Sequence, residues 1–312
     1  MEPGVPPSDA PPAPGGWLRS GVSALLGALP AAAPAWIYTV LLRPAPLRAL
    51  ANALLRRLIP PTLALPEGVL LLNQEDPVVS GALALGVYET GSLSAWRQVL
   101  DRPDMTVLDI GGNIGLYSLI AASRCPASQV IAFEPETRNA AILKAMAQAN
   151  GFTNLAVVNA GAGAVNGEAT LFLDPDNKGK HSLVRDGARQ QVTTIALVTI
   201  DDTVARHGLS RIDAVKIDVE GWEEQVFLGM GEVLARDHPT LLFEFAPVRI
   251  RLAGGDPERL LQRLVGLGYG LAALDEADGA RQPVTDVAVF LARFCHRDAY
   301  RNVLATWPAE SP

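Results

Sequence analysis

Residues 107–115 read VLDIGGNIG, the most informative stretch of the sequence. An apolar run ends at Asp109 and Ile110, glycines follow at once, and a helical pattern begins at Ile114. Glycines at a strand-to-helix turn let a ligand approach the backbone closely and let the helix pack against the strand. The stretch therefore predicts a ligand-binding turn of an α/β fold.

The acid at the end of this run distinguishes between ligands. Asp109 would repel a pyrophosphate, but it suits a ligand that carries an ammonium or sulfonium group. The G-x-G-x-x-G fingerprint of dinucleotide sites also requires a glycine where Asn113 stands. S-adenosylmethionine is therefore a better candidate than a nicotinamide dinucleotide. The alternative is a turn whose glycines serve packing only.

Strand and helix patterns alternate on the carboxyl-terminal side of the turn. The runs expected as buried strands are 105–110, 129–134, 155–160, 213–218 and 240–245. The helical patterns lie at 114–123, 137–150, 202–207, 223–235 and 257–267. Strands separated by helices predict right-handed crossovers and a mostly parallel, doubly wound sheet.

Two pairs of runs depart from this alternation. Residues 269–274 and 287–291 have a polar loop but no helix between them, which predicts an antiparallel pair. The runs 168–173 and 192–200 flank a polar loop at 174–191. We interpret them as an inserted β-hairpin whose long loop lies over the site.

Further ionisable residues follow the apolar runs, at the end where open α/β sheets bind ligands. Glu134 comes after the second strand, where its carboxylate could accept both hydroxyls of a ribose. Asp218 and Glu220 follow Lys216 on a later run, and Glu244 ends the next one. A structural ion pair between Lys216 and Glu220 is the alternative. Oxygen ligands from the later acids would suit Mg²⁺, but no spacing pattern supports a metal site and none is assigned.

The order of these motifs carries a family resemblance. It runs VLDIGGNIGLYS, FEPE, the NKGKHSL loop, TIDD, KIDVEGWE and LLFEF, and extends over residues 70–275. In this order the chain resembles the FkbM-type family of S-adenosylmethionine-dependent methyltransferases. The resemblance implies a Rossmann-like core with a mostly parallel seven-stranded sheet and an antiparallel last strand. It also implies methyl transfer to a hydroxyl oxygen of a sugar, a macrolide or another secondary metabolite.

The resemblance also assigns roles to individual residues. The methionine end of the cofactor would contact Asp109, Gly111, Asn113 and Gly115, the ribose Glu134, and the adenine Asn159. The acceptor would contact Ser182, Glu220 and Glu244. A hydroxyl acceptor must lose its proton, and our candidates for the base are His181 and Asp218. His181 has the more suitable ordinary pKa, and Asp218 has the more suitable predicted location.

The chain divides into four expected segments. These are a disordered Pro-rich leader (1–16), an apolar helical extension (17–68), the methyltransferase domain (69–298) and a C-terminal tail (299–312). Residues 20–42 carry no charge but contain Pro30 and Pro34. We interpret them as short helices packed on the domain, and weak membrane-surface contact through residues 20–57 is the alternative.

Composition excludes several other classes. The net charge of −7 over 312 residues, without basic clusters, argues against a nucleic-acid binder. Two distant cysteines, Cys125 and Cys295, exclude a disulfide scaffold and a cysteine-based zinc site and suggest a cytoplasmic location. The expected partner is a small-molecule or glycan acceptor. A non-catalytic module that binds an adenosyl ligand or a protein would have lost cofactor-facing residues, and these are present.

Overall fold

The computed structural model describes residues 59–76, 78–84, 86, 88–174, 177–185, 191–294 and 300–308. The leader expected at residues 1–16 and most of the apolar extension lie outside the described residues. The weak membrane contact expected of residues 20–57 therefore stays a prediction. Among the helices that the structure describes, none combines the length and the apolar composition needed to cross a membrane.

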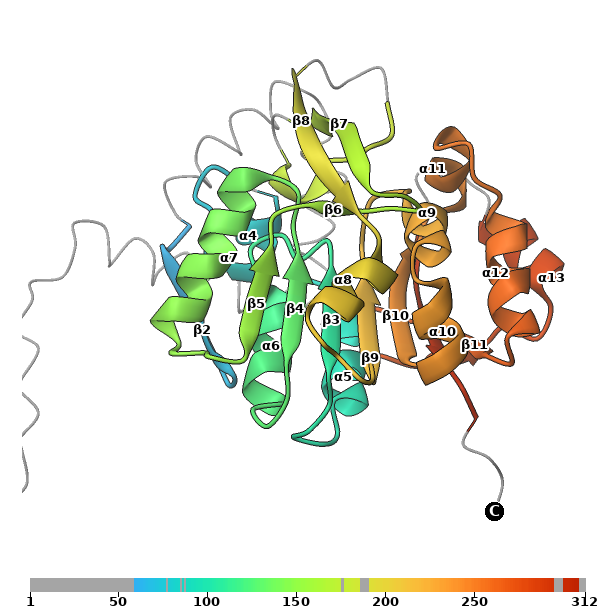
Figure 1. The fold of residues 1–312 in the computed structure, drawn as a ribbon, viewed down its shortest axis with the longest axis horizontal. Coiled ribbons are helices and arrows are strands. Elements are labelled where there is room, and N and C mark those ends of the chain that lie inside the picture. The colour runs from blue at the N-terminus through green and yellow to red at the C-terminus, as the bar shows by residue number, and fades with distance from the viewer. Residues whose placement is uncertain are drawn as a thin grey trace, which may run out of the picture.

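An eight-stranded sheet forms the centre of the fold (Figure 1). Its strand order is β12-β11-β13-β10-β9-β3-β4-β5. The strands are β3 (Val107–Ile110), β4 (Val130–Phe133), β5 (Leu155–Val158), β9 (Ala214–Ile217), β10 (Thr240–Phe245), β11 (Gly270–Leu274), β12 (Arg281–Pro283) and β13 (Arg301–Thr306). Strands β10, β9, β3, β4 and β5 are parallel to one another, and β13 is antiparallel to β10 and β11. The mostly parallel sheet with an antiparallel last strand is confirmed, and the short edge strand β12 is added to the seven strands expected.

Helices cover both faces of the sheet, because the strands at its centre are apolar on both sides. Every residue of β3, β4 and β9 is buried. One face carries α5 (Thr90–Val99), α6 (Leu116–Arg124) and α7 (Thr137–Ala149). The other carries α8 (Ile200–Arg206), α9 (Glu223–Leu228), α10 (Gly231–Asp237), α11 (Pro247–Leu252), α12 (Pro257–Gly266) and α13 (Val287–Phe294). Side chains alternate along a strand, so Asp109 and Lys216 share the face of α6 with Val107 and Ala214.

The carboxyl-terminal part of the sheet differs from the prediction. Residues 287–291 belong to helix α13, and the strands that pair with β11 are β12 and β13. A short apolar run fits a strand or a helix equally well. Here Asp286 selects the helix, because its carboxylate accepts the backbone N–H of Val289 at 3.0 Å as a helix cap. Strand β13 lies within the stretch 299–312 expected as a tail, yet it occupies the interior of the sheet.

A hairpin and a short helix precede the sheet in the chain. Strands β1 (Thr62–Leu65) and β2 (Gly68–Leu71) pair antiparallel where a helical extension was expected, and α4 (Val79–Ala84) follows. Asn150, after α7, pairs with the edge of β2. Its Oδ1 accepts the N–H of Val69 at 2.7 Å, and its Nδ2 donates to the Val69 carbonyl at 2.7 Å. The hairpin is thereby fixed against the helical layer.

The helix expected at 223–235 is interrupted between α9 and α10. Gly229 lies so close to the backbone of Gly163 that a Cβ would be 2.0 Å from the Gly163 carbonyl oxygen. This close approach joins the sheet's helical layer to the segment that leads into the inserted hairpin.

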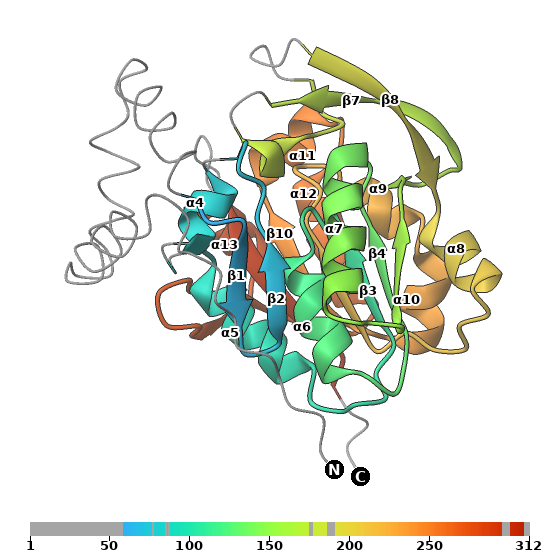
Figure 2. The same ribbon diagram turned by 90° about the vertical axis from the view of Figure 1, so that its left-hand side faces the viewer.

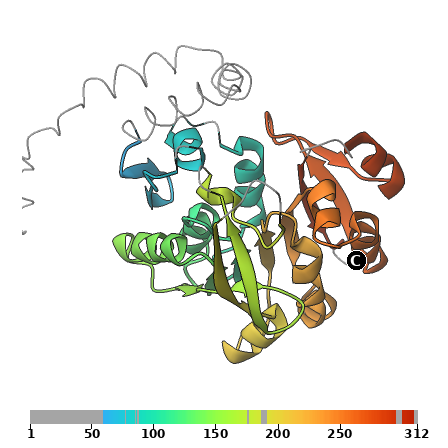
Figure 3. The ribbon, with the colours of Figure 1, turned by 90° about the horizontal axis from the view of Figure 1, so that it is seen from above.

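The inserted hairpin is confirmed as a small second sheet. Strands β7 (Gly167–Leu173) and β8 (Gln191–Val198) are antiparallel, and β6 (Gly161–Ala162) pairs parallel with β8. Figure 2 and Figure 3 show β7 and β8 lying across the edge of the large sheet where β3 and β4 end. The insertion therefore covers the edge at which the sequence places the functional residues.

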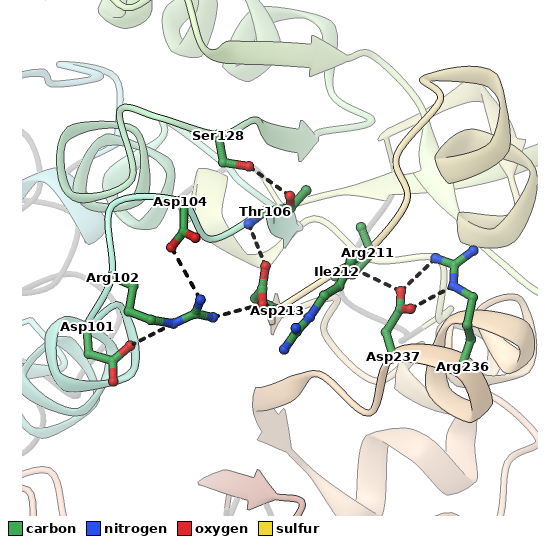
Figure 4. Close-up of polar contacts among 10 residues, drawn as sticks. All are labelled: Asp101, Arg102, Asp104, Thr106, Ser128, Arg211, Ile212, Asp213, Arg236 and Asp237. Atoms are coloured by element: carbon green, nitrogen blue, oxygen red, sulfur yellow. Dashed lines mark hydrogen bonds and ion pairs between the residues drawn. The ribbon is translucent and has the colours of Figure 1, made fainter.

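At the opposite edge, acidic side chains are bound by arginines (Figure 4). Asp213, just before β9, accepts the backbone N–H of Thr106 at 2.9 Å and forms an ion pair with Arg102 at 3.0 Å. Asp237 forms an ion pair with Arg236 at 2.6 Å. These carboxylates tie the loops at the amino ends of the strands together.

Candidate active site

The turn between β3 and α6 is held by the end of the neighbouring strand. The backbone N–H groups of Gly111 and Gly112 both donate to the carbonyl oxygen of Phe133 at 2.9 Å. The N–H of Asn113, whose φ is 48°, donates to Oε2 of Glu134 at 2.8 Å. The turn and the end of β4 therefore form one connected unit.

Two glycines of the turn are required by close approach. Gly111 has φ 85°, and a Cβ there would be 1.8 Å from the carbonyl oxygen of Asp218. Gly115 has φ 94°, and its Cβ would be 2.6 Å from Cε of Met146. Only glycine combines such a φ with such limited space. The turn consequently lies directly against the residue that follows β9.

Glu134 is buried and accepts two backbone hydrogen bonds. In addition to Asn113, the N–H of Glu136 donates to its Oε1 at 2.8 Å. Burial raises the pKa of Glu134 to about 8, although the two N–H donors favour the ionised form. Asn159 supports the same segment, because its Nδ2 donates to the carbonyl oxygens of Glu134 and Pro135 at 2.8 and 3.1 Å.

Asp109 lies beneath the turn and is 1% exposed. Its Oδ2 accepts a hydrogen bond from Ser118 of α6 at 2.5 Å. Burial raises the pKa of Asp109 to about 6, while the Ser118 hydrogen bond and the charge of Lys216 lower it. A carboxylate held in this way can pair with a cationic part of a ligand above the turn.

Lys216 is the buried cation of the site. It is 1% exposed, and its Nζ lies 3.6 Å from Oδ2 of Asp218 and 4.8 Å from the centroid of the Tyr117 ring. Burial lowers the pKa of Lys216, but Asp218, Glu89 and other nearby carboxylates raise it by more. Lys216 therefore stays protonated and compensates part of the negative charge around it.

Glu89, which the sequence analysis did not single out, completes the acidic group. It has φ 41° at the start of α5, and its Oε2 accepts the hydroxyl hydrogen of Tyr117 at 2.7 Å. Burial raises the pKa of Glu89 to about 7. One carboxylate oxygen each of Glu89, Asp218 and Glu244 lies within 4.8 Å of the others. Burial also raises the pKa of Glu244 well above its ordinary value.

Glu220 pairs elsewhere. Its carboxylate forms an ion pair with Arg249, so the pair with Lys216 considered from the sequence is replaced by Lys216 with Asp218. The Glu220 carbonyl oxygen accepts the Ser182 hydroxyl hydrogen at 2.8 Å. The structure thus joins the predicted acceptor residues Ser182 and Glu220 to each other, and it joins Glu244 to Asp218.

The inserted loop places His181 in a defined hydrogen-bonding state. The backbone N–H of Asp174 donates to Nδ1 of His181 at 3.0 Å. In a neutral imidazole the other nitrogen then carries the hydrogen, so the lone pair that could accept a proton is already in use. Gly179 of the same loop packs against Val79 and Asn113, since a Cβ would be 2.6 Å from Val79 Cγ2 and 3.2 Å from Asn113 Nδ2.

The turn and the end of β4 present acceptors that could hold ammonium and ribose groups. In the described part of the chain, Oδ1 of Asn113 is a buried acceptor without a hydrogen-bond partner. It lies on the turn above Asp109, and Glu134 presents a carboxylate next to it.

The family whose model matches the sequence is the methyltransferase FkbM domain, over residues 109–271.

The chain belongs to the FkbM methyltransferase family. The matched residues make up more than half of the chain and include β4, β9 and β10. The FkbM family uses S-adenosylmethionine.

Similarity to individual known proteins is distant. The chain is 26% identical over 214 residues to the AMB antimetabolite synthetase AmbE of Pseudomonas aeruginosa, a match covering 56% of this chain and 10% of AmbE. It is 27% identical over 208 residues to the 31-O-demethyl-FK506 methyltransferase FkbM of Streptomyces tacrolimicus, covering 57% and 76%. The crystal structure of a methyltransferase FkbM from Methylobacillus flagellatus aligns with TM-score 0.43 and 15% identity, covering 84% of this chain and 59% of that one.

Proposed function

We propose that this chain transfers a methyl group from S-adenosylmethionine to a hydroxyl of a small molecule, such as a sugar, a glycan or a secondary metabolite. One observation carries the proposal: the contact between Gly111 and Asp218. It places the backbone of Asp218, whose side chain is 22% exposed, directly beside the turn that would hold the cofactor. The relative from Streptomyces tacrolimicus, whose name describes an O-methylation, supports oxygen as the methylated atom.

The cofactor half consists of residues that already hydrogen-bond to one another. Asp109 and Oδ1 of Asn113 would receive the ammonium group, and the carboxylate of Glu134 would receive the ribose hydroxyls. Asn159 would contribute indirectly, because it holds the backbone of Glu134 and Pro135 at the place expected for the adenine. When bound, S-adenosylmethionine supplies the methyl group, whose transfer forms a carbon–oxygen bond and breaks the carbon–sulfur bond.

The protein's part is alignment and removal of one proton. Alignment of the acceptor oxygen with the methyl group can contribute about 7–11 kcal/mol to lowering the barrier. Asp218 would take the proton of the acceptor hydroxyl, since its side chain is 22% exposed and it directly follows the carboxyl end of β9. His181 is the weaker choice because its Nδ1 accepts the Asp174 N–H. Ser182, Glu220 and Glu244 would surround the acceptor.

Calorimetry with three ligands tests the proposal. We expect S-adenosylmethionine and S-adenosylhomocysteine to bind with dissociation constants of about 1–10 µM and NAD not to bind. Asp109→Ala should abolish this binding, whereas Asp104→Asn, an exposed acid at the opposite edge, should leave it unchanged. Binding of NAD, or full affinity in the Asp109 variant, would overturn the assignment.

Activity then separates an enzyme from a binding module. With a hydroxyl acceptor in hand, Asp218→Asn should lower kcat by about 10²–10⁴ while the affinity for S-adenosylhomocysteine stays the same. Binding of the cofactor without methylation of hydroxyl acceptors across a panel of sugars and metabolites would favour the non-catalytic module.

A further inference from the structure

Three carboxylates from three different elements meet beside the turn. One oxygen each of Glu89, Asp218 and Glu244 lies within 4.8 Å of the other two. Two ligand oxygens on opposite sides of one ion are separated by twice the metal–oxygen distance, which is about 4.2 Å for Mg²⁺ and about 4.6–5.2 Å for Ca²⁺. The three oxygens are therefore close enough to share one ion of the size of Ca²⁺, and a smaller ion would draw them slightly closer together.

Asn302 gives an independent indication of a ligand. Its side chain is 1% exposed, and in the described part of the chain its Oδ1 has no hydrogen-bond partner. Its Nδ2 donates to Oε1 of Glu276, after β11, at 2.9 Å. A buried amide oxygen without a partner is unfavourable, and such atoms are rare in folded proteins.

The register of the sheet directs this free oxygen. Strand β13 lies between β11 and β10, and Asn302 is directly opposite Glu244. Opposite residues of an antiparallel pair have their side chains on the same face, with Cβ atoms about 4.5–5.5 Å apart. Because Nδ2 turns toward Glu276 on the β11 side, Oδ1 remains on the side of β10 and Glu244.

The charge balance also leaves room for a cation. Glu89, Asp218 and Glu244 share the buried ammonium of Lys216, which is 3.6 Å from Asp218. Arg249 is 3.9 Å from Glu244 and is closer to Glu220. At the opposite edge of the sheet, by contrast, Asp213 and Asp237 are each paired with an arginine at 3.0 Å or less.

We propose that Glu89, Asp218, Glu244 and Oδ1 of Asn302 bind a divalent cation that prefers oxygen ligands. Four oxygens, three of them from carboxyl groups that are ionised when the ion is bound, suit Mg²⁺, Mn²⁺ or Ca²⁺. Asp218, one of these ligands, contacts Gly111 of the turn through its backbone. If the proposed function holds, the ion would bind the acceptor hydroxyl and make its proton easier to remove. One oxygen of Asp218 is sufficient for the ion, which leaves the other to receive the proton.

Titration calorimetry of the full chain, freed of metal by EDTA and dialysis, tests the site directly. We expect MnCl₂, MgCl₂ or CaCl₂ to bind at about one ion per chain with a dissociation constant below about 1 mM. Glu244→Gln and Asn302→Ala should each weaken binding about tenfold or more, and Asp101→Asn, a 69% exposed acid at the opposite edge, should not. Thermal unfolding of each variant shows whether it is folded.

Binding of S-adenosylhomocysteine, measured on the same samples, separates the two proposals. A chain that binds S-adenosylhomocysteine but none of the three ions at about 10 mM overturns the cation site and leaves the methyltransferase assignment intact. A chain that binds an ion but not S-adenosylhomocysteine supports the cation site and overturns the proposed function. Ion binding that survives unchanged in both folded variants also overturns the assigned ligands.

Discussion

The backbone N–H of Asn113 donates to a carboxylate oxygen of Glu134 at 2.8 Å, although the two residues follow different strands of the sheet. The same glutamate accepts the N–H of Glu136 with its other oxygen. A single carboxylate thus shapes the turn and stands at the place expected for the ribose. The structural and ligand-binding roles of Glu134 can be separated by experiment.

Glu134→Gln should weaken the binding of S-adenosylhomocysteine. At pH 9, above the pKa of Glu134, this carboxyl is ionised. A hydrogen bond to a charged acceptor is worth about 1.5–3 kcal/mol, which corresponds to a roughly 10–150-fold increase in the dissociation constant. Calorimetry measures this directly. Glu168→Gln, on the exposed start of β7, is the matched control and should bind as the wild type does. Equal affinity in the two variants would remove Glu134 from the cofactor site.

The same carboxyl predicts a pH dependence of stability. Burial raises the pKa of Glu134 from 4.5 to about 8, so between these values the folded protein holds a proton that the unfolded chain has released. Its contribution to the free energy of unfolding is complete below pH 4.5 and is lost as the pH rises to about 8, by up to about 1.4 kcal/mol per pH unit. Urea unfolding of Glu134→Gln should therefore show a shallower decline over this range, and an identical slope would contradict the burial of an ionisable group there.

Two glycines that both have a positive φ separate the effect of backbone strain from that of close approach. Gly111 has φ 85° and Gly151 has φ 67°, but only at Gly111 would a Cβ meet another atom, the Asp218 carbonyl oxygen at 1.8 Å. We expect Gly111→Ala to lower the free energy of unfolding by roughly 2–4 kcal/mol and Gly151→Ala by about 1 kcal/mol. Denaturant unfolding of both variants measures the two losses. Equal losses would contradict the close approach at Gly111 as the cause of the larger effect.

Removal of the buried ammonium should be costly. In Lys216→Met, Asp218 and its acidic neighbours lose the cation that partly compensates them, and breaking a buried pair in this way destabilises proteins by about 3–5 kcal/mol. Arg138→Met removes one partner of an exposed pair with Glu75 and should change stability by less than about 1 kcal/mol. Chemical unfolding of both proteins gives the two values. Similar losses of stability in the two variants would mean that Lys216 does not compensate the charge of Asp218 and its acidic neighbours.

The sequence predicted the cofactor half of the site because its residues are close in the chain. A strand, a glycine turn and a helix are local patterns, and Asp109, Asn113 and Gly115 lie within one of them. Glu134 could be added because parallel strands end at the same edge of a sheet. The strand at 240–245 was predicted at its observed bounds because a mostly apolar run of this length is typical of a strand that is buried on both faces.

The acceptor half could not be predicted, because its members are far apart in the chain. Glu89 reaches Asp218 and Glu244 only because α5 packs beside the end of the sheet, and no periodicity in the sequence marks it. Asn302 was missed for a related reason. The apolar run at 287–291 competed for the position of the last strand, and the helix cap at Asp286 settled that competition.

The position of β13 constrains how the protein can be made. Its neighbours β10 and β11 hydrogen-bond to β13 and not to each other, so the large sheet stays divided until residues 301–306 have left the ribosome. During translation, Glu244 and the open edge of β10 are therefore exposed to solvent and to other nascent chains. The side of the site that would receive the acceptor therefore forms only after β13 has paired with β10, whereas the turn and Glu134 do not need β13 in order to fold.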